Sequence, residues 1–104
     1  MFAVVIGEPA RGVAVVSLRP NVWYDGPVAL LDELYVEPEM RNRGLGTELL
    51  AAVRTQCRAR RVEQIEINVD IGDIDARRFY ERHGFSAIEP DTGEHALWYQ
   101  GGVD

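Results

Sequence analysis

The chain has 104 residues, 46% hydrophobic and 27% charged, a composition typical of one soluble domain over residues 1–104. Its formal net charge of −6 argues against nucleic acid as a partner, because a phosphate backbone would repel an acidic surface. No window reaches the roughly 18 apolar residues of a membrane-spanning helix, and the first residues lack the basic start of a signal peptide. We therefore expect a cytoplasmic protein with no membrane partner.

Three β-strands are predicted in the first third of the chain. Residues 2–7 and 13–18 are rich in β-branched side chains, and the short segment between them contains Pro9 and Gly12, as in a hairpin. A third strand over residues 28–36 follows a segment dense in turn residues. This strand ends before Pro38, which cannot donate to a strand ladder.

Helices and strands alternate in the rest of the chain. Over residues 45–60 the apolar side chains recur at three- and four-residue spacing, which is typical of a helix with one buried face. Further elements are predicted in chain order as a strand at 64–70, a helix at 75–83, and strands at 86–90 and 95–100. The order β-β-β-α-β-α-β-β predicts an α+β fold, in which two main helices pack on a central mixed β-sheet.

Cys57 is the only cysteine, so an intramolecular disulfide is impossible. It falls at helical spacing from Leu49, Leu50 and Val53, on the apolar side of the helix predicted over residues 45–60. This position favours a small buried apolar residue over a reactive nucleophile.

Two glycines, Gly44 and Gly46, stand where the helix predicted over residues 45–60 should begin. The first N–H groups of a helix have no partners within the helix, and together with the positive end of the helix dipole they can bind an anion. Glycine at this place lets a phosphate oxygen approach the backbone without meeting a Cβ atom. A plain loop-to-helix turn is the alternative.

Two common phosphate-binding motifs do not fit this turn. A P-loop requires lysine and then serine or threonine after its last glycine, whereas Gly46 is followed by Thr47 and Glu48. A dinucleotide-binding turn requires a third glycine at the position that Leu49 occupies.

The context of the glycine turn closely resembles the GNAT superfamily of acyl-CoA-dependent N-acetyltransferases. The pattern formed by Arg41, Gly44 and Gly46 lies between a strand and an amphipathic helix, and the stretch DARRFYERHGF at residues 75–85 follows one strand later. This resemblance covers residues 2–99 and implies acetyl-CoA as the co-substrate, with no metal ion. In that family the glycine turn binds the coenzyme A pyrophosphate through backbone N–H groups.

The resemblance also implies the rest of the coenzyme site. The strand before the turn would pair through its backbone with the pantetheine arm, which would lie in a gap between residues 35–36 and residues 68–69. The implied coenzyme-binding residues are Leu34, Tyr35, Val36, Arg41, Asn42, Arg43, Gly44, Leu45, Gly46, Thr47 and Asn68.

A general acid and a general base are implied by the same resemblance. Tyr80 matches a tyrosine that often protonates the leaving thiolate, although packing against Phe79 would also explain a tyrosine on this helix. Glu33 is the first candidate for the base that deprotonates the amine, and alternation places it on the same side of its strand as Leu31 and Tyr35. Asp32 or a water molecule are the alternatives.

Three other polar residues are weaker candidates for a role in this site. Asp73 stands where the family often has asparagine, and an aspartate can cap a helix but its charge suits a pyrophosphate poorly. His83 and His95 are weaker candidates for the base. The dipole at the end of the helix over residues 75–83 favours a cationic His83 in a structural role.

Few residues of the sequence indicate where the acceptor amine would bind. GNAT chains usually begin with one strand and two helices before the hairpin, whereas this sequence starts at the hairpin. Trp23 and Tyr24, in the turn-rich segment, are the candidates for binding the acceptor, and packing within the turn explains them equally well. The absence of those front elements would expose an apolar sheet face, so we expect a homodimer.

The leading functional hypothesis is an acetyltransferase that moves the acetyl group of acetyl-CoA to a primary amine by direct attack. The rival hypothesis is a non-catalytic acyl-CoA-binding or protein-interaction module on the same fold. Thiol release with a panel of amines would separate the two, and the identity of the acceptor stays open.

Overall fold

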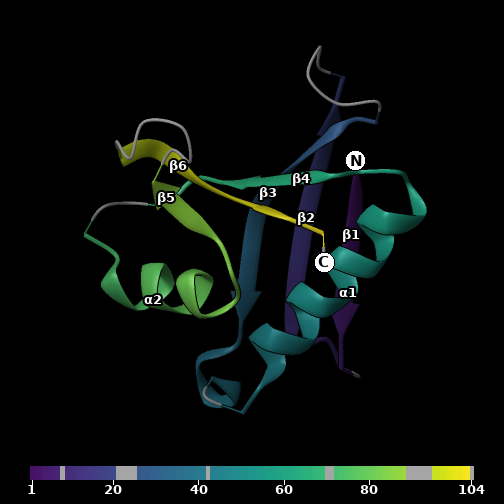
Figure 1. Cartoon of the computed structure of the whole chain (residues 1–104). Helices are drawn as coiled ribbons and strands as arrows, with labels where there is room; N and C mark the ends of the chain where they lie inside the picture. The colour runs from purple at the N-terminus through teal and green to yellow at the C-terminus, as the bar shows by residue number, and fades with distance from the viewer. Residues whose placement is uncertain (8, 21–25, 42, 70–71, 89–94, 104) are drawn as a thin grey trace.

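The computed structural model describes residues 1–7, 9–20, 26–41, 43–69, 72–88 and 95–103. Its strands and helices are β1 (Phe2–Ile6), β2 (Gly12–Arg19), β3 (Val28–Val36), the short 3-10 helix η1 (Pro38–Met40), α1 (Leu45–Ala59), β4 (Gln64–Ile67), α2 (Ile74–Arg82), β5 (Ser86–Ile88) and β6 (His95–Gly102). The strands form one sheet in the order β1-β2-β3-β4-β6-β5 (Figure 1). None of the described helices has the length and apolar character needed to cross a membrane.

The sheet is mixed, as the element order predicts. β3 and β4 run parallel and are joined through α1, whereas the other neighbouring strands are antiparallel. Figure 1 shows α1 on the side of β1 and β2, and α2 on the side of β5. The α+β fold with two main helices on a central mixed sheet is therefore confirmed.

One face of the sheet carries the hydrophobic core. Ala14 and Val16 of β2 pair with Leu34 and Leu31 of β3, and these residues belong to one cluster that also contains Leu49 and Tyr80. Because Leu49 comes from α1 and Tyr80 from α2, both helices cover this same face. Cys57 also lies in this cluster and is fully buried, which confirms its predicted place in the core.

The opposite face of β1, β2 and β3 is open among the described residues. Val5 is 59% exposed and Tyr35 is 44% exposed, which is unusual for large apolar and aromatic side chains of a sheet. The two faces of the sheet therefore differ, one covered by helices and one open to solvent.

A bulge interrupts β3 in the middle. Leu31 pairs with Val16 of β2 and Glu33 pairs with the preceding residue Val15, so Asp32 is an extra residue in the ladder. Val15 and Val16 are adjacent in β2 and therefore point to opposite faces of the sheet. Their partners Glu33 and Leu31 must then also lie on opposite faces. The prediction that simple alternation places Glu33 on the side of Leu31 is therefore wrong, although Glu33 does share its side with Tyr35.

Candidate active site

The two central strands separate beyond Leu31. β3 pairs with β4 only from Val28 to Leu31, and β4 ends at Ile67 rather than continuing to residue 70 as predicted. Residues of β3 beyond the bulge keep their pairing with β2, but no described strand pairs with their other edge. An extended ligand arm could therefore form backbone hydrogen bonds along that edge.

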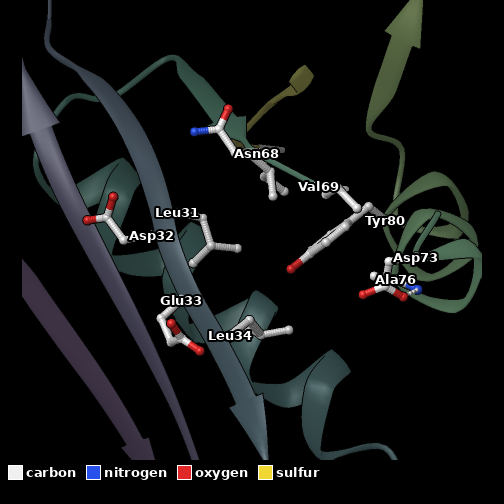
Figure 2. Close-up of a pocket in the computed structure, with 10 residues that line it drawn as sticks. Leu31, Asp32, Glu33, Leu34, Asn68, Val69, Asp73, Ala76 and Tyr80 are labelled. Atoms are coloured by element: carbon white, nitrogen blue, oxygen red, sulfur yellow. Dashed lines mark hydrogen bonds between the residues drawn. The ribbon is translucent and has the colours of Figure 1, made fainter. Parts of the chain in front are cut away.

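A cleft of about 460 Å³ lies where the strands separate. It is lined by Leu31, Asp32, Glu33, Leu34, Ile67, Asn68, Val69, Asp73, Ala76 and Tyr80 (Figure 2). The lining includes Leu34, Glu33, Asn68 and Tyr80, which the sequence predicts for the site. Leu31 and Ile67 were not among the predicted site residues, because their place beside the cleft depends on the register between β3 and β4.

Tyr80 reaches into this cleft from α2. Figure 2 shows its hydroxyl oxygen pointing across the gap toward β3. The side chain is only 7% exposed, yet its hydroxyl has no hydrogen-bond partner among the described residues. The ring of Tyr80 is therefore packed in the core, while its hydroxyl is open to the cleft and available to bond to a ligand.

Burial and nearby charges keep the Tyr80 phenol protonated. Burial, followed by the negative charges of Asp73 and Glu33, raises the pKa of Tyr80 from 10.0 to about 12. The phenol therefore remains a hydrogen-bond donor at neutral pH. A group that must deliver a proton to a ligand requires this state.

The raised pKa of Tyr80 predicts a loss of stability at alkaline pH. The folded state binds this proton more tightly than the unfolded state, so the stabilising contribution is complete below pH 10.0 and is lost as pH rises through about 12. Across this interval wild type should lose roughly 3 kcal/mol relative to a Tyr80→Phe variant. Urea unfolding of both proteins at several pH values measures the difference, and parallel pH curves would contradict it.

The two acidic residues at the bulge, Asp32 and Glu33, differ in their hydrogen bonding. The Ser17 hydroxyl donates a hydrogen bond to the Asp32 carboxylate, whereas Glu33 has no hydrogen bond or ion pair among the described residues. Asp32 lies on the far side of the β3 ribbon from Tyr80 in Figure 2, while Leu31 and Leu34 project toward Tyr80. The cleft thus has the Tyr80 phenol on the helix-covered face of the sheet and the bulge carboxylates on the β3 side.

The glycine turn leads into α1 as predicted, but the two glycines have different roles. Gly44 is the N-cap of α1 with φ of 83°, a left-handed conformation that favours glycine, and no side chain caps this helix start. A Cβ atom on Gly44 would meet nothing within 4 Å, so the space beside the turn is open. These two features fit a phosphate group against the N–H groups of the helix start.

Gly46 instead allows the two helices to pack together. A Cβ atom at this position would lie 3.2 Å from two ring atoms of Phe79 in α2. The interpretation that both glycines make room for a phosphate is therefore corrected, because Gly46 faces a protein side chain. The contact joins the coenzyme turn to the helix that carries Tyr80.

Arg41 and Thr47 are both engaged with the protein. Arg41 Nε donates to the Val36 carbonyl oxygen at 3.1 Å, and its guanidinium lies 5.8 Å from the ring centroid of Tyr35. Thr47 Oγ1 lies 3.2 Å from His83 Nε2, a contact between the helix start and the end of α2 that the sequence analysis missed.

The surroundings of His83 disfavour its cationic form, contrary to the expectation from the helix dipole. Burial, followed by the positive charges of Arg54 and Arg82, lowers the pKa of His83 below its usual value of 6.5. These arginines act against the dipole, which alone would favour a cation at the end of α2. Asp73 does cap the start of α2, since its carboxylate accepts a hydrogen bond of 3.2 Å from the Ala76 N–H.

The remaining predicted residues are spread around the turn or lie outside the described residues. Arg43 is exposed and Leu45 begins α1, next to Gly44. Asn42, Trp23 and Tyr24 lie outside the described residues, as does the side chain of His95.

Comparison with known proteins identifies the family. Residues 2–85 match the Acetyltransferase (GNAT) family, and the chain belongs to this family. It is 33% identical over 75 residues to a mycothiol acetyltransferase of Beutenbergia cavernae, covering 69% of this chain and 25% of that protein. It is 38% identical over 74 residues to an aminoalkylphosphonate N-acetyltransferase of Salmonella typhimurium, covering 71% of this chain and 48% of that protein.

Solved structures share the fold. A protein of Arthrobacter sp. FB24, provisionally assigned as an acetyltransferase, is 55% identical with a TM-score of 0.85, covering 93% of this chain and 62% of that one. The PaiA N-acetyltransferase of Thermoplasma acidophilum in complex with coenzyme A is 18% identical with a TM-score of 0.73, covering 89% of this chain and 54% of that one, and is similar in fold alone. The chain thus spans less than two thirds of each of these relatives.

Proposed function

We propose that this chain transfers the acetyl group of acetyl-CoA to an amine by direct attack, without a covalent enzyme intermediate. The observation that carries the proposal is the Tyr80 side chain, whose ring is buried and whose hydroxyl faces the cleft without a hydrogen-bond partner among the described residues. On the other side of the same cleft lies Glu33, a carboxylate without an ion pair among the described residues. An acid and a base across one cleft suit a reaction that both removes and adds a proton.

The coenzyme would lie along the path from the glycine turn to the cleft. The helix start at Gly44 would bind the pyrophosphate, and the edge of β3 from Leu34 to Val36 would pair with the pantetheine arm. Backbone N–H groups of β3 beyond the bulge would polarise the thioester carbonyl. Arg41 and Arg43 add positive charge on the segment that leads into this turn.

The chain would move two protons during the reaction. Glu33 would accept a proton from the amine, directly or through water, so that the nitrogen can attack the carbonyl carbon. As the new C–N bond forms and the C–S bond breaks, Tyr80 would donate its proton to the departing sulfur. Glu33 is preferred to Asp32 as the base because Asp32 already accepts a hydrogen bond from Ser17.

Two measurements test this function. Titration calorimetry with coenzyme A should show binding, and thiol release from acetyl-CoA should depend on an added amine. Coenzyme binding without thiol release from any amine would instead support the non-catalytic module. The cytoplasmic location and the homodimer stay predictions, and light scattering would distinguish a dimer from the 11.7 kDa chain.

A further inference from the structure

The bulge in β3 brings two successive carboxylates to one cleft. In a regular strand Asp32 and Glu33 would point to opposite faces. Because Asp32 is an extra residue between Leu31 and Glu33 in the ladder with β2, the alternation is broken at this point. Both acidic residues are exposed and both line the cleft that Tyr80 faces.

The two carboxylates are suited to different tasks. Asp32 is tied to β2 by the hydrogen bond from the Ser17 hydroxyl, which fixes the position of its negative charge. Glu33 has no such bond among the described residues, so it can move to accept a proton. One fixed anion and one adaptable anion therefore lie side by side along the strand.

The charge of the cleft is not balanced by its own lining. Asp32, Glu33 and Asp73 all line it, and none of the lining residues that the structure describes is lysine, arginine or histidine. The Tyr80 side chain is 7% exposed, and its hydroxyl points into the same space without a hydrogen bond to a described residue, which separates this cleft from an ordinary solvated acidic patch. An acceptor that complements the carboxylates of this cleft would therefore bring positive charge, while Tyr80 faces the coenzyme sulfur.

We propose that the acceptor is a diamine, in which Glu33 deprotonates the amine that is acetylated and Asp32 binds the second amine as an ammonium ion. This inference rests on the proposed function and specifies its substrate class. An acceptor with a single amine would leave the fixed carboxylate of Asp32 without a cation once the reacting nitrogen becomes neutral. A second ammonium group supplies that cation throughout the reaction.

Putrescine and n-butylamine provide the matched probes, because they share the carbon chain and differ by one amino group. In wild type the ratio of kcat/KM for putrescine to that for butylamine should exceed one, and Asp32→Asn should lower this ratio about tenfold. The asparagine side chain can still bond to Ser17, so the strand should keep its structure. Ser17→Ala should lower the ratio in the same direction but by less, since it frees Asp32 without removing its charge.

Glu63→Gln is the control for net charge. Glu63 is exposed and precedes β4, at the opposite end of this strand from Asn68, so the substitution removes one negative charge away from the cleft. This variant should keep the wild-type ratio. An equal fall in Glu63→Gln and Asp32→Asn would overturn the assignment of Asp32.

The outcomes separate the diamine inference from the proposed function. Turnover of both amines with equal kcat/KM in wild type would overturn the diamine inference and leave the acetyltransferase proposal standing. If no amine releases thiol, calorimetry with the coenzyme A complex decides the inference. Tighter binding of putrescine than of butylamine, lost in Asp32→Asn, would support the diamine site while the catalytic proposal fails, and equal binding would overturn both.

Discussion

Replacing Tyr80 with phenylalanine is expected to lower the rate of acetyl transfer about a hundredfold, which is typical of losing a general acid. The substitution removes only the hydroxyl, so the ring keeps its contacts with Phe79 and Phe85. Because the hydroxyl bonds to no described residue, its loss breaks no hydrogen bond among them. Thiol-release kinetics should show the fall in kcat, and calorimetry should show nearly unchanged coenzyme A affinity.

Tyr99 is the matched control for Tyr80. It is also nearly fully buried, and its ring centroid lies 6.5 Å from that of Tyr80. Its hydroxyl, however, accepts from Arg77 Nε at 3.1 Å and donates to Glu81 at 3.4 Å, so it is satisfied within the protein. Tyr99→Phe should lower stability by about 1.5–3 kcal/mol and leave kcat close to wild type. Equal losses of kcat in both variants would contradict the role of Tyr80.

Sequence patterns predict those parts of the fold that depend on local spacing. The apolar repeat that contains Leu49, Leu50 and Val53 predicts α1 because one helix face repeats every three or four residues. The alternation of Ile65 and Ile67 with polar residues likewise predicts β4. Both patterns reflect burial against a single surface, so they are visible without knowledge of the partner.

The bulge in β3 depends on a different strand, which explains why the sequence did not reveal it. No residue type at Asp32 requires an extra position; the register with Val15 and Val16 of β2 creates it. Gly46 is a second example. A Cβ atom at this position would contact Phe79, which lies more than thirty residues later in the chain. Local pattern therefore placed candidate residues near the site but could not assign the face of Glu33.

The protonation preference of His83 also could not be predicted from the local sequence. The helix dipole at the end of α2 can be read from the sequence, and it favours a cation. The opposing effects come from burial and from Arg54 of α1, which is distant in sequence but donates to the His83 carbonyl oxygen at 2.5 Å. Tertiary contacts therefore decide this protonation state.

Replacing Gly44 with valine should lower coenzyme A affinity about ten- to a hundredfold, because phosphate contacts with the helix start would be lost. The valine side chain would enter the open space beside the turn, where a phosphate group is proposed to lie. The left-handed backbone at φ of 83° also costs a side chain about 1–2 kcal/mol of stability. Titration calorimetry and urea unfolding measure these two effects separately.

Gly84→Val separates the strain of the backbone from the loss of the ligand site. Gly84 has φ of 88°, so valine suffers the same conformational strain there, but this residue follows α2 and lies outside the proposed coenzyme turn. Both variants should lose similar stability, since a β-branched residue is disfavoured in this conformation at either place. Only Gly44→Val should lose affinity for coenzyme A. If the two variants bind coenzyme A equally, the pyrophosphate does not lie at the start of α1.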